Sequence, residues 1–305
     1  MACTTKPVLL SIVGPTAVGK TALSIQVAKH FKAPILSADS RQMYRHIPIG
    51  TARPSLEEQD GVAHHFIDCL DLEEEYSAGQ FERDALELIQ GELNHHPVIL
   101  LVGGSGLCVK ALLEGLDDVP KDEHIREQLI QRHRTVGLAP LLEELAEYDP
   151  ESYARIDRQN PQRVIRALEV CLTSGRPFSS FHSKKKVDRP FQSVLVGLRR
   201  DRMELKERIA QRYGEMMESG WMDEAREVYD KRHLNSLNTV GYKEIFRFLD
   251  GEWDEEVMEK EVIKETQRFA KRQMTWFKKM SDIHWLDLPH ERPVEQIIDW
   301  VESYS

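Results

Sequence analysis

One glycine-rich segment near the N-terminus constrains the fold of this chain more than any other feature. It has the form G-x-x-x-x-G-K-T and consists of Gly14, Pro15, Thr16, Ala17, Val18, Gly19, Lys20 and Thr21. The apolar run Val8–Val13 precedes it, and apolar residues at helical spacing follow it. A strand, a glycine-rich loop and a helix in this order direct backbone N–H groups to one point, where an oligophosphate binds. We predict a phosphate-binding loop with Lys20 as its cation and the Thr21 hydroxyl as a ligand of Mg²⁺. The alternative is a glycine-rich turn around a buried lysine stem.

The first acidic residue that follows a strand favours group transfer over ATP hydrolysis. In ATP-hydrolysing proteins an acidic residue at the end of an apolar strand helps to hold Mg²⁺. The strand candidate Val98–Val102 runs instead into Gly103–Gly106, with no carboxylate. Asp39 closes the apolar run that starts at Pro34. A carboxylate there suits a general base acting on an acceptor beside the phosphates. A helix cap, or an outer partner of Mg²⁺, is the alternative role.

The order of apolar segments predicts the domain organisation of the 305 residues. Strand-like and helical patterns alternate in the first part, as a parallel sheet requires. From 121 to 189 the pattern is helical without a strand-like run, and a strand candidate returns at 193–198. We therefore predict an α/β fold with a three-layer P-loop core and a parallel sheet, formed by residues 1–120 and 190–305. Residues 121–189 form an inserted, mainly helical domain.

Composition excludes several classes of protein. The four cysteines are scattered and contain no C-x-x-C pair, which argues against a zinc or disulfide framework. The adjacent histidine pairs His64-His65 and His95-His96 have no third ligand at useful spacing. No apolar run approaches the roughly 20 residues of a membrane span, and the first strand begins too early for a signal peptide. We expect a cytoplasmic protein without a membrane partner.

Positive charge is concentrated in two segments, although the net charge is −10. Between Tyr153 and Pro190 nine basic residues, including Lys184, Lys185 and Lys186, stand against three acidic ones. Between Lys264 and Lys279 there are six basic residues and one acidic residue. Basic patches in an acidic chain are typical of contacts with a phosphate backbone. A solvated helix face gives the same pattern.

Ten motifs in order along the chain resemble the bacterial tRNA dimethylallyltransferase family. They begin with the phosphate loop and span the chain almost to its C-terminus. The other nine are Asp39–Tyr44, Ile49–Pro54, His64–Asp68, Tyr76–Ala78, Phe81–Ala85, Gly103–Leu107, Asn160–Glu169, Val240–Glu244 and Ala270–Phe277. Beyond the phosphate loop each motif is weak alone, and their order carries the resemblance.

The resemblance implies a reaction and its participants. Dimethylallyl diphosphate would occupy the phosphate loop, with Lys20 and Thr21-bound Mg²⁺ neutralising the departing pyrophosphate. Ser105 would be a catalytic residue whose hydroxyl contacts the diphosphate or the tRNA. The acceptor would be the exocyclic amine of the adenosine 3′ to the anticodon, flipped out of its stack, with Asp39 accepting the proton. Ser40, Arg41 and Gln42 match positions that hold this adenosine, and Gln42 carries a donor and an acceptor for its edge. We expect a monomer.

In the insertion the resemblance implies contacts with the anticodon stem-loop of tRNA. The matching positions are Gln162, Arg163 and Arg166, and the first and last share one helix face. An ion pair of Arg166 with Glu169 or Asp157 is the alternative role for that residue.

Three positions depart from the family pattern. Ser105 replaces a frequent Thr and keeps the hydroxyl, whereas Cys108 replaces a common Tyr and leaves the wall of the prenyl pocket undefined. Asn238 stands where many members have an Arg that binds pyrophosphate; Lys243 and Arg247 are nearby cations. Three rival functions remain, in order of decreasing fit: a free-adenylate prenyltransferase, a P-loop small-molecule kinase and a non-catalytic tRNA-binding protein.

Overall fold

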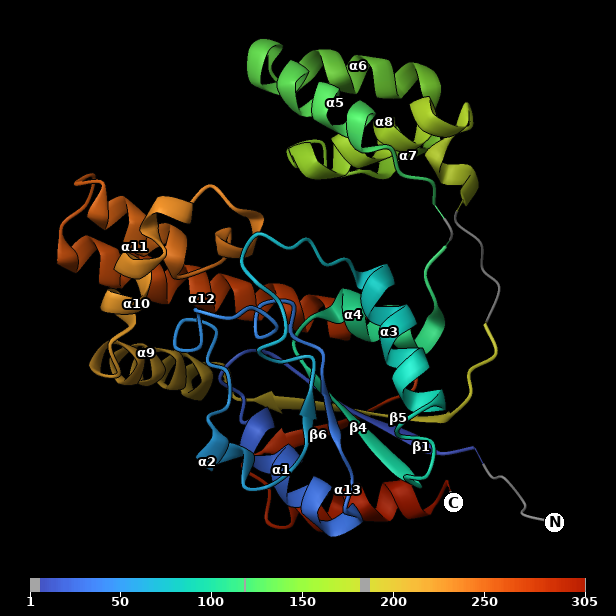
Figure 1. Cartoon of the computed structure of the whole chain (residues 1–305), viewed down its shortest axis with the longest axis vertical. Coiled ribbons are helices and arrows are strands. Elements are labelled where there is room, and N and C mark those ends of the chain that lie inside the picture. The colour runs from blue at the N-terminus through green and yellow to red at the C-terminus, as the bar shows by residue number, and fades with distance from the viewer. Residues whose placement is uncertain (1–5, 118, 182–186, 305) are drawn as a thin grey trace. The chain divides into compact units, whose positions relative to one another are not determined.

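The chain forms two compact units in the computed structural model, which describes residues 6–117, 119–181 and 187–304 (Figure 1). The first unit comprises Met1–Glu114 and Asp188–Ser305, and the second is the insertion Gly115–Val187. The sequence prediction placed these boundaries at 121 and 189. Lys184, Lys185 and Lys186 lie outside the described residues.

A six-stranded sheet forms the centre of the first unit. All neighbouring strands are parallel, in the order β3-β2-β4-β1-β5-β6. In the central strand, Val8 lies opposite Val98 on one side and Gln192 on the other. The strands are β1 (Val8–Val13), β2 (Ile35–Ser37), β3 (His64–His65), β4 (Val98–Gly103), β5 (Gln192–Arg200) and β6 (Ile283–Leu288).

Helices cover both faces of this sheet, because alternate residues of β1 point to opposite sides. Leu10 and Ile12 belong to the core shared with α1 (Lys20–Phe31) and α13 (Pro293–Glu302). Leu9 and Val13 belong to the core shared with α3 (Ala78–Gln90) and α4 (Gly106–Glu114) (Figure 1). The predicted α/β fold with a parallel sheet between two helical layers is confirmed.

A third apolar core lies beyond the carboxyl ends of the strands. It joins Tyr44, Ile47 and Leu72, from the segments after β2 and β3, to the helices near the C-terminus. These helices and short 3₁₀ turns are α9 (Arg202–Glu218), α10 (Trp221–Glu227), η2 (Tyr229–Lys231), η3 (Asn235–Leu237), α11 (Tyr242–Leu249) and α12 (Glu255–Phe277). A short helix, α2 (Leu56–Gln59), precedes β3.

The insertion has a core of its own, and its regular elements are helical throughout its described part. Leu129, Leu141, Leu145 and Leu168 are almost completely buried in it. Side-chain caps from Asp149 and Asn160 begin two of its helices, so these turn residues were informative in the sequence. The elements are α5 (Glu123–Val136), α6 (Ala139–Tyr148), α7 (Pro150–Arg155), α8 (Pro161–Ser174) and η1 (Phe178–Phe181). Among the helices of the described chain, none combines the length and the apolar character needed to cross a bilayer.

Candidate active site

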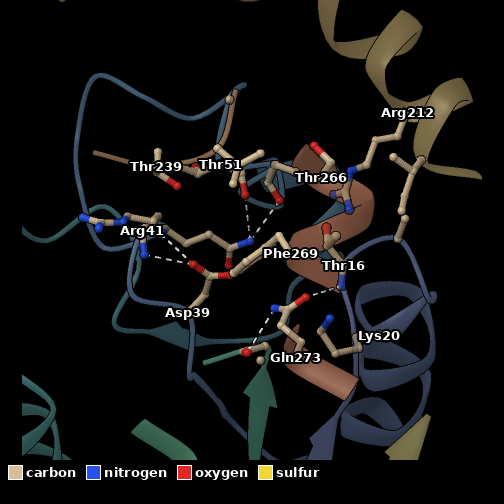
Figure 2. Close-up of a pocket in the computed structure, with 18 of the residues that line it drawn as sticks. Thr16, Lys20, Asp39, Arg41, Thr51, Arg212, Thr239, Thr266, Phe269 and Gln273 are labelled. Atoms are coloured by element: carbon tan, nitrogen blue, oxygen red, sulfur yellow. Dashed lines mark hydrogen bonds between the residues drawn. The ribbon is translucent and has the colours of Figure 1, made fainter. Parts of the chain in front are cut away.

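A cavity of about 950 Å³ opens at the carboxyl ends of β1, β2 and β4 (Figure 2). The phosphate loop, the segment after β2 and the segment after β4 line it together with side chains of α9 and α12. The cavity therefore brings together most of the site residues predicted in the first unit. Those that line it are Thr16, Ala17, Gly19, Lys20, Thr21, Asp39, Ser40, Arg41, Gln42 and Ser105.

The phosphate loop is closed around its own lysine. Lys20 Nζ donates to the carbonyls of Gly14 at 3.0 Å and Pro15 at 2.8 Å. Burial lowers the pKa of Lys20 to about 8; Asp39 opposes this shift and Arg212 adds to it. Gly14 has a φ of 153°, and a Cβ there would lie 2.8 Å from the carbonyl oxygen of Leu198, so the loop requires glycine at this position.

Three side chains from the C-terminal half hydrogen-bond to the backbone of the loop, and the sequence prediction does not include them. Arg208 Nε donates to the Ala17 carbonyl and Arg200 Nε to the Val18 carbonyl, each at 2.8 Å. The buried amide of Gln273 accepts from Thr16 N at 2.9 Å and donates to Gly104 O at 3.0 Å. Gln273 lies within the Ala270–Phe277 motif, so a signal was present but gave no role.

Asp39 presents one engaged and one available carboxylate oxygen. Oδ1 accepts from the backbone N–H groups of Arg41 at 2.9 Å and Gln42 at 3.4 Å. Within the described chain Oδ2 has no hydrogen-bond partner. One oxygen thus stabilises the turn after β2, as a cap does, and the other remains able to accept a proton.

The neighbours of Asp39 build the walls of the cavity with their side chains. The Gln42 amide donates to the carbonyls of Thr51 and Ala52 and accepts from Ser37 Oγ. Contact of Gln42 with an adenosine edge stays a prediction, and in this structure both ends of its amide have protein partners.

The Arg41 side chain binds the segment around η3, which reaches the cavity at Asn238. Its guanidinium donates to the carbonyls of Asn235, Ser236 and Asn238, which form and follow η3. Ser40 is exposed beside it. Arg41 is therefore occupied by backbone acceptors, and its contact with tRNA likewise stays a prediction.

Arg212 of α9 is a cation that the sequence prediction overlooked. It lines the cavity and makes no hydrogen bond or ion pair within the described residues (Figure 2). Burial lowers the pKa of its guanidinium. Lys243 also lines the cavity, whereas Arg247 lies over the Trp253 ring and pairs with Glu252. Positive charge at the site thus comes from α9 as well as from the phosphate loop.

Ser105 and Cys108 differ in their relation to the cavity. The Ser105 hydroxyl accepts from Cys108 N at 3.5 Å and lines the cavity. Cys108 is 5% exposed and lies in the core shared with α3, outside the lining, and burial raises its pKa. The thiol therefore forms no part of the cavity wall.

The Thr21 hydroxyl is suited to bind a metal ion that takes most of its other coordinating oxygens from a bound diphosphate and water. Thr21 lines the cavity, and its hydroxyl has no hydrogen-bond partner in the described chain. Mg²⁺ commonly takes one or two protein oxygens and completes its shell with phosphate oxygens and water. Across the residues described, no group of three or more His, Cys, Asp or Glu side chains could hold a metal ion on its own.

In the insertion, one of the three predicted tRNA-contacting residues is bonded to other residues of the insertion, and the other two are exposed. Arg166 pairs with the buried Glu169 at 2.7 Å and donates to the carbonyls of Val119 and Pro120. Its alternative role as a structural ion pair is therefore realised. Gln162 and Arg163 are exposed on the first turn of α8. Their side chains remain available to a partner of the insertion.

Comparison with known proteins gives consistent results along the chain. The family model described as "IPP transferase" matches residues 42–280. The "tRNA dimethylallyltransferase" of Christiangramia forsetii is 47% identical over 296 residues, which cover 97% of each chain. The "tRNA dimethylallyltransferase 1" of Bacteroides fragilis is 43% identical over 300 residues, covering 98% of this chain and 99% of its own.

Solved structures give the same result. The crystal structure of the full-length tRNA isopentenylpyrophosphate transferase from Bacillus halodurans has a TM-score of 0.72 and 35% identity, covering 98% of this chain and 96% of its own. A eukaryotic dimethylallyltransferase, solved acting on tRNA, has a TM-score of 0.76 and 26% identity, covering 92% of this chain and 74% of its own.

Proposed function

The chain belongs to the IPP transferase family, and from that premise we propose that it transfers a dimethylallyl group to tRNA. The resemblance inferred from the ordered motifs is confirmed, and with it the prediction of a transferase. The proposed donor is dimethylallyl diphosphate, and the acceptor is the exocyclic amine of the adenosine 3′ to the anticodon. A requirement for Mg²⁺, a monomeric state and a cytoplasmic location belong to the same proposal.

The observation that carries the proposal is the position of Asp39 in the same cavity as the phosphate loop. A kinase or an ATP-hydrolysing protein also needs the loop. A base beside the loop, in a cavity open to a large acceptor, fits transfer of the group attached to the phosphates. The available Oδ2 is the atom that would receive the proton.

The leaving group is stabilised by charge that surrounds the loop. As the bond between the allylic carbon and the diphosphate oxygen breaks, negative charge grows on pyrophosphate. Lys20 and Arg212 neutralise that charge, while backbone N–H groups of the loop hold the oxygens. A Mg²⁺ ion bound through Thr21 would supply further charge neutralisation. Arg212 thereby provides the cation that Asn238 lacks.

The acceptor amine becomes a nucleophile as its proton leaves. The adenine nitrogen forms a bond to the allylic carbon while the carbon–oxygen bond breaks, and its proton passes to Asp39 Oδ2. The turn formed by the N–H groups of Arg41 and Gln42 orients this carboxylate. The phosphate loop and Asp39 thus have separate roles: the loop binds the departing pyrophosphate, and Asp39 accepts the proton.

Exposed basic residues support tRNA rather than a free nucleotide as acceptor. Arg163 offers an exposed cation in the insertion. On α12, Lys264 and Arg268 pair with Glu261 and Glu265, whereas Lys271 and Arg272 are exposed without an acidic partner in the described chain. A free adenylate needs no exposed cations on each of the two units.

Mass spectrometry of tRNA after incubation with the protein, Mg²⁺ and dimethylallyl diphosphate tests this function. We expect one added dimethylallyl group on the adenosine beside the anticodon and loss of the product in Asp39→Asn. Parallel reactions with AMP, ADP and ATP test the free-adenylate alternative. Prenylated nucleotide in place of prenylated tRNA would reverse the assignment of the acceptor.

A further inference from the structure

Helix α10 carries a buried carboxylate that the proposed reaction does not use. Glu224 is 7% exposed and makes no ion pair with any residue that the structure describes. Three donors meet its charge instead: Oε2 accepts from Ile49 N at 2.8 Å, and Oε1 accepts from Gly50 N at 2.8 Å and from the Tyr242 hydroxyl. A carboxylate is costly to bury unless hydrogen bonds replace its water. Glu224 thus joins α10 and α11 to a segment far earlier in the chain.

The segment that Glu224 binds is a turn at the edge of the cavity, formed by residues 47–53. The backbone N–H of Ala52 donates to Ile49 O at 2.8 Å within this turn. Gly50, Thr51 and Ala52 line the cavity. Glu224 lies outside the lining, so any effect that it has on the cavity passes through the turn.

The same turn supplies two hydrogen-bond partners of the Gln42 amide. Nε2 donates to Thr51 O at 3.3 Å and to Ala52 O at 3.0 Å, while Oε1 accepts from Ser37 Oγ at 3.2 Å. A glutamine amide has two N–H donors and an oxygen with two lone pairs. The turn therefore takes both donors, and one lone pair of Oε1 is left for a ligand. The position of the turn decides which end of the amide is available.

Gly50 leaves no room between the turn and the helices behind it. A Cβ at this position would lie 2.2 Å from Trp221 Nε1 and 2.3 Å from Tyr242 Oη. Both of these side chains are buried, and their rings meet edge to face at 5.9 Å between centroids. Close-packed interiors do not accept an extra group without strain. Helices α10 and α11 thus hold the turn both by hydrogen bonds and by close packing.

We propose that Glu224 is a positioning residue for the acceptor side of the cavity. By anchoring the turn, it fixes the Gln42 amide with its nitrogen toward the turn and one lone pair of its oxygen free for the acceptor base. The inference rests on the proposed function, in which Gln42 is expected to hold the acceptor adenosine. Misplacement of a reacting group by about 1 Å can cost roughly 10²-fold in rate. Release of the turn should therefore slow transfer, although Glu224 touches no substrate.

A double-mutant cycle between Glu224 and Gln42 tests this role. Glu224→Gln retains the size of the side chain but offers one carbonyl oxygen to two backbone N–H groups that now bind separate oxygens. We expect the single-turnover rate to fall by roughly 10²-fold, with the affinity for dimethylallyl diphosphate unchanged. In a Gln42→Ala background the same change should have no further effect, because both variants remove one shared interaction. Independent structural damage would instead multiply the two losses.

Two further variants separate positioning from a loss of stability. Gly50→Ala displaces the turn from Trp221 and Tyr242 without altering a carboxylate, and it should show the same lack of additivity with Gln42→Ala. Tyr242→Phe removes one hydrogen bond from Glu224 but leaves both backbone bonds, so it should keep the wild-type rate. Multiplied losses in the cycle, or a Tyr242→Phe variant as slow as Glu224→Gln, would overturn the inference.

Hydrogen exchange of residues 47–53 reports on the anchor without any reaction. Glu224→Gln should speed exchange in this segment, and Tyr242→Phe should not. Unchanged exchange in a folded Glu224→Gln variant would overturn the inference. The cycle is also read as affinity for a synthetic anticodon stem-loop, which needs no transfer. Faster exchange and non-additive affinities in a protein that prenylates no tRNA would retain the inference and overturn the function. Wild-type transfer with multiplied losses would do the reverse.

Discussion

The side chain of Gln273 accepts a hydrogen bond from the backbone of Thr16, and this bond ties α12 to the phosphate loop at 2.9 Å. The other end of the same amide donates to Gly104, so one residue fixes two of the three segments that line the cavity. The amide has no charge to offer a substrate, and its role is to position both loops.

Replacement of Gln273 by leucine should therefore weaken pyrophosphate binding and destabilise the protein. The partly buried N–H of Thr16 and the buried carbonyl of Gly104 would lose their partner, at a cost of up to about 1–3 kcal/mol each. Calorimetry with pyrophosphate and thermal unfolding measure the two effects. Thr275→Ala is the control, because Thr275 is exposed on the same helix. Unaltered pyrophosphate affinity in Gln273→Leu would show that the amide does not position the loop.

Asp39→Asn should retain both substrates and lose transfer. The amide preserves the acceptor that caps the turn after β2 but cannot take a proton from the acceptor amine. We expect the single-turnover rate to fall by about 10²–10⁴-fold, with affinities for tRNA and donor near those of the wild type. Rapid-quench kinetics at saturating donor measure this rate. A single-turnover rate equal to that of the wild type would remove Asp39 from the chemistry.

Pyrophosphate binding should depend on pH through Lys20. Its pKa in the free protein is lowered to about 8 from 10.5, so the ammonium is fully charged only below that value. Above it, binding requires proton uptake, and affinity should fall by up to about tenfold per pH unit. Titrations between about pH 7 and pH 9.5 in several buffers measure this. Lys20→Met should bind weakly and lose the dependence; the same slope in that variant would assign the proton to another group.

Arg163 and Arg166 should give opposite results although they lie on one helix turn. Arg163→Ala should weaken tRNA binding and lower the salt slope by roughly one unit, because each phosphate contact releases a counterion. Affinity for the donor should not change. Binding titrations at several salt concentrations, with calorimetry of the donor, provide the measurement. A folded Arg163→Ala variant with wild-type tRNA affinity would argue against the insertion as a tRNA-binding surface.

Arg166→Ala should instead destabilise the insertion, because buried Glu169 would lose its closest cation. Arg126 lies at 3.5 Å from the same carboxylate and Asp122 N at 3.2 Å, so part of the stabilisation remains. We expect a loss of about 1–3 kcal/mol, measured by chemical unfolding. An unfolding free energy equal to that of the wild type would return Arg166 to the tRNA-contacting residues.

The sequence was most informative where periodicity and turn residues agree. The regular apolar spacing of the sequence predicts a helix over 202–218, and helix α9 has these bounds, with Asp201 as its cap. The same kind of spacing predicts a helix over 221–231, but α10 ends at Glu227 and a 3₁₀ turn follows from Tyr229 to Lys231. Strand β3 has two residues, too few for an alternating pattern to appear.

Side-chain direction was the part of the site that the sequence could not supply. Arg41 and Gln42 bind backbone carbonyls, and any residue type carries a carbonyl, so no sequence pattern marks such partners. Arg212 follows Arg208 by one helix turn. In the sequence, this spacing is equally typical of a helix face exposed to solvent. Tertiary packing decides which charged residues of α9 face the cavity. This packing depends on α12 and the phosphate loop together.

The hydrogen bonds of Arg41 connect Asp39, the proposed base, to the turn around η3. The backbone of Arg41 orients Asp39, while its guanidinium grips the turn that ends at Asn238. A movement of this turn therefore reaches the carboxylate through one residue, whichever side chain stands at position 238, because the acceptor there is a backbone carbonyl. The orientation of the proposed base thus depends on the position of a backbone turn, and a substitution that moves this turn would reorient Asp39 without changing any charge at the site.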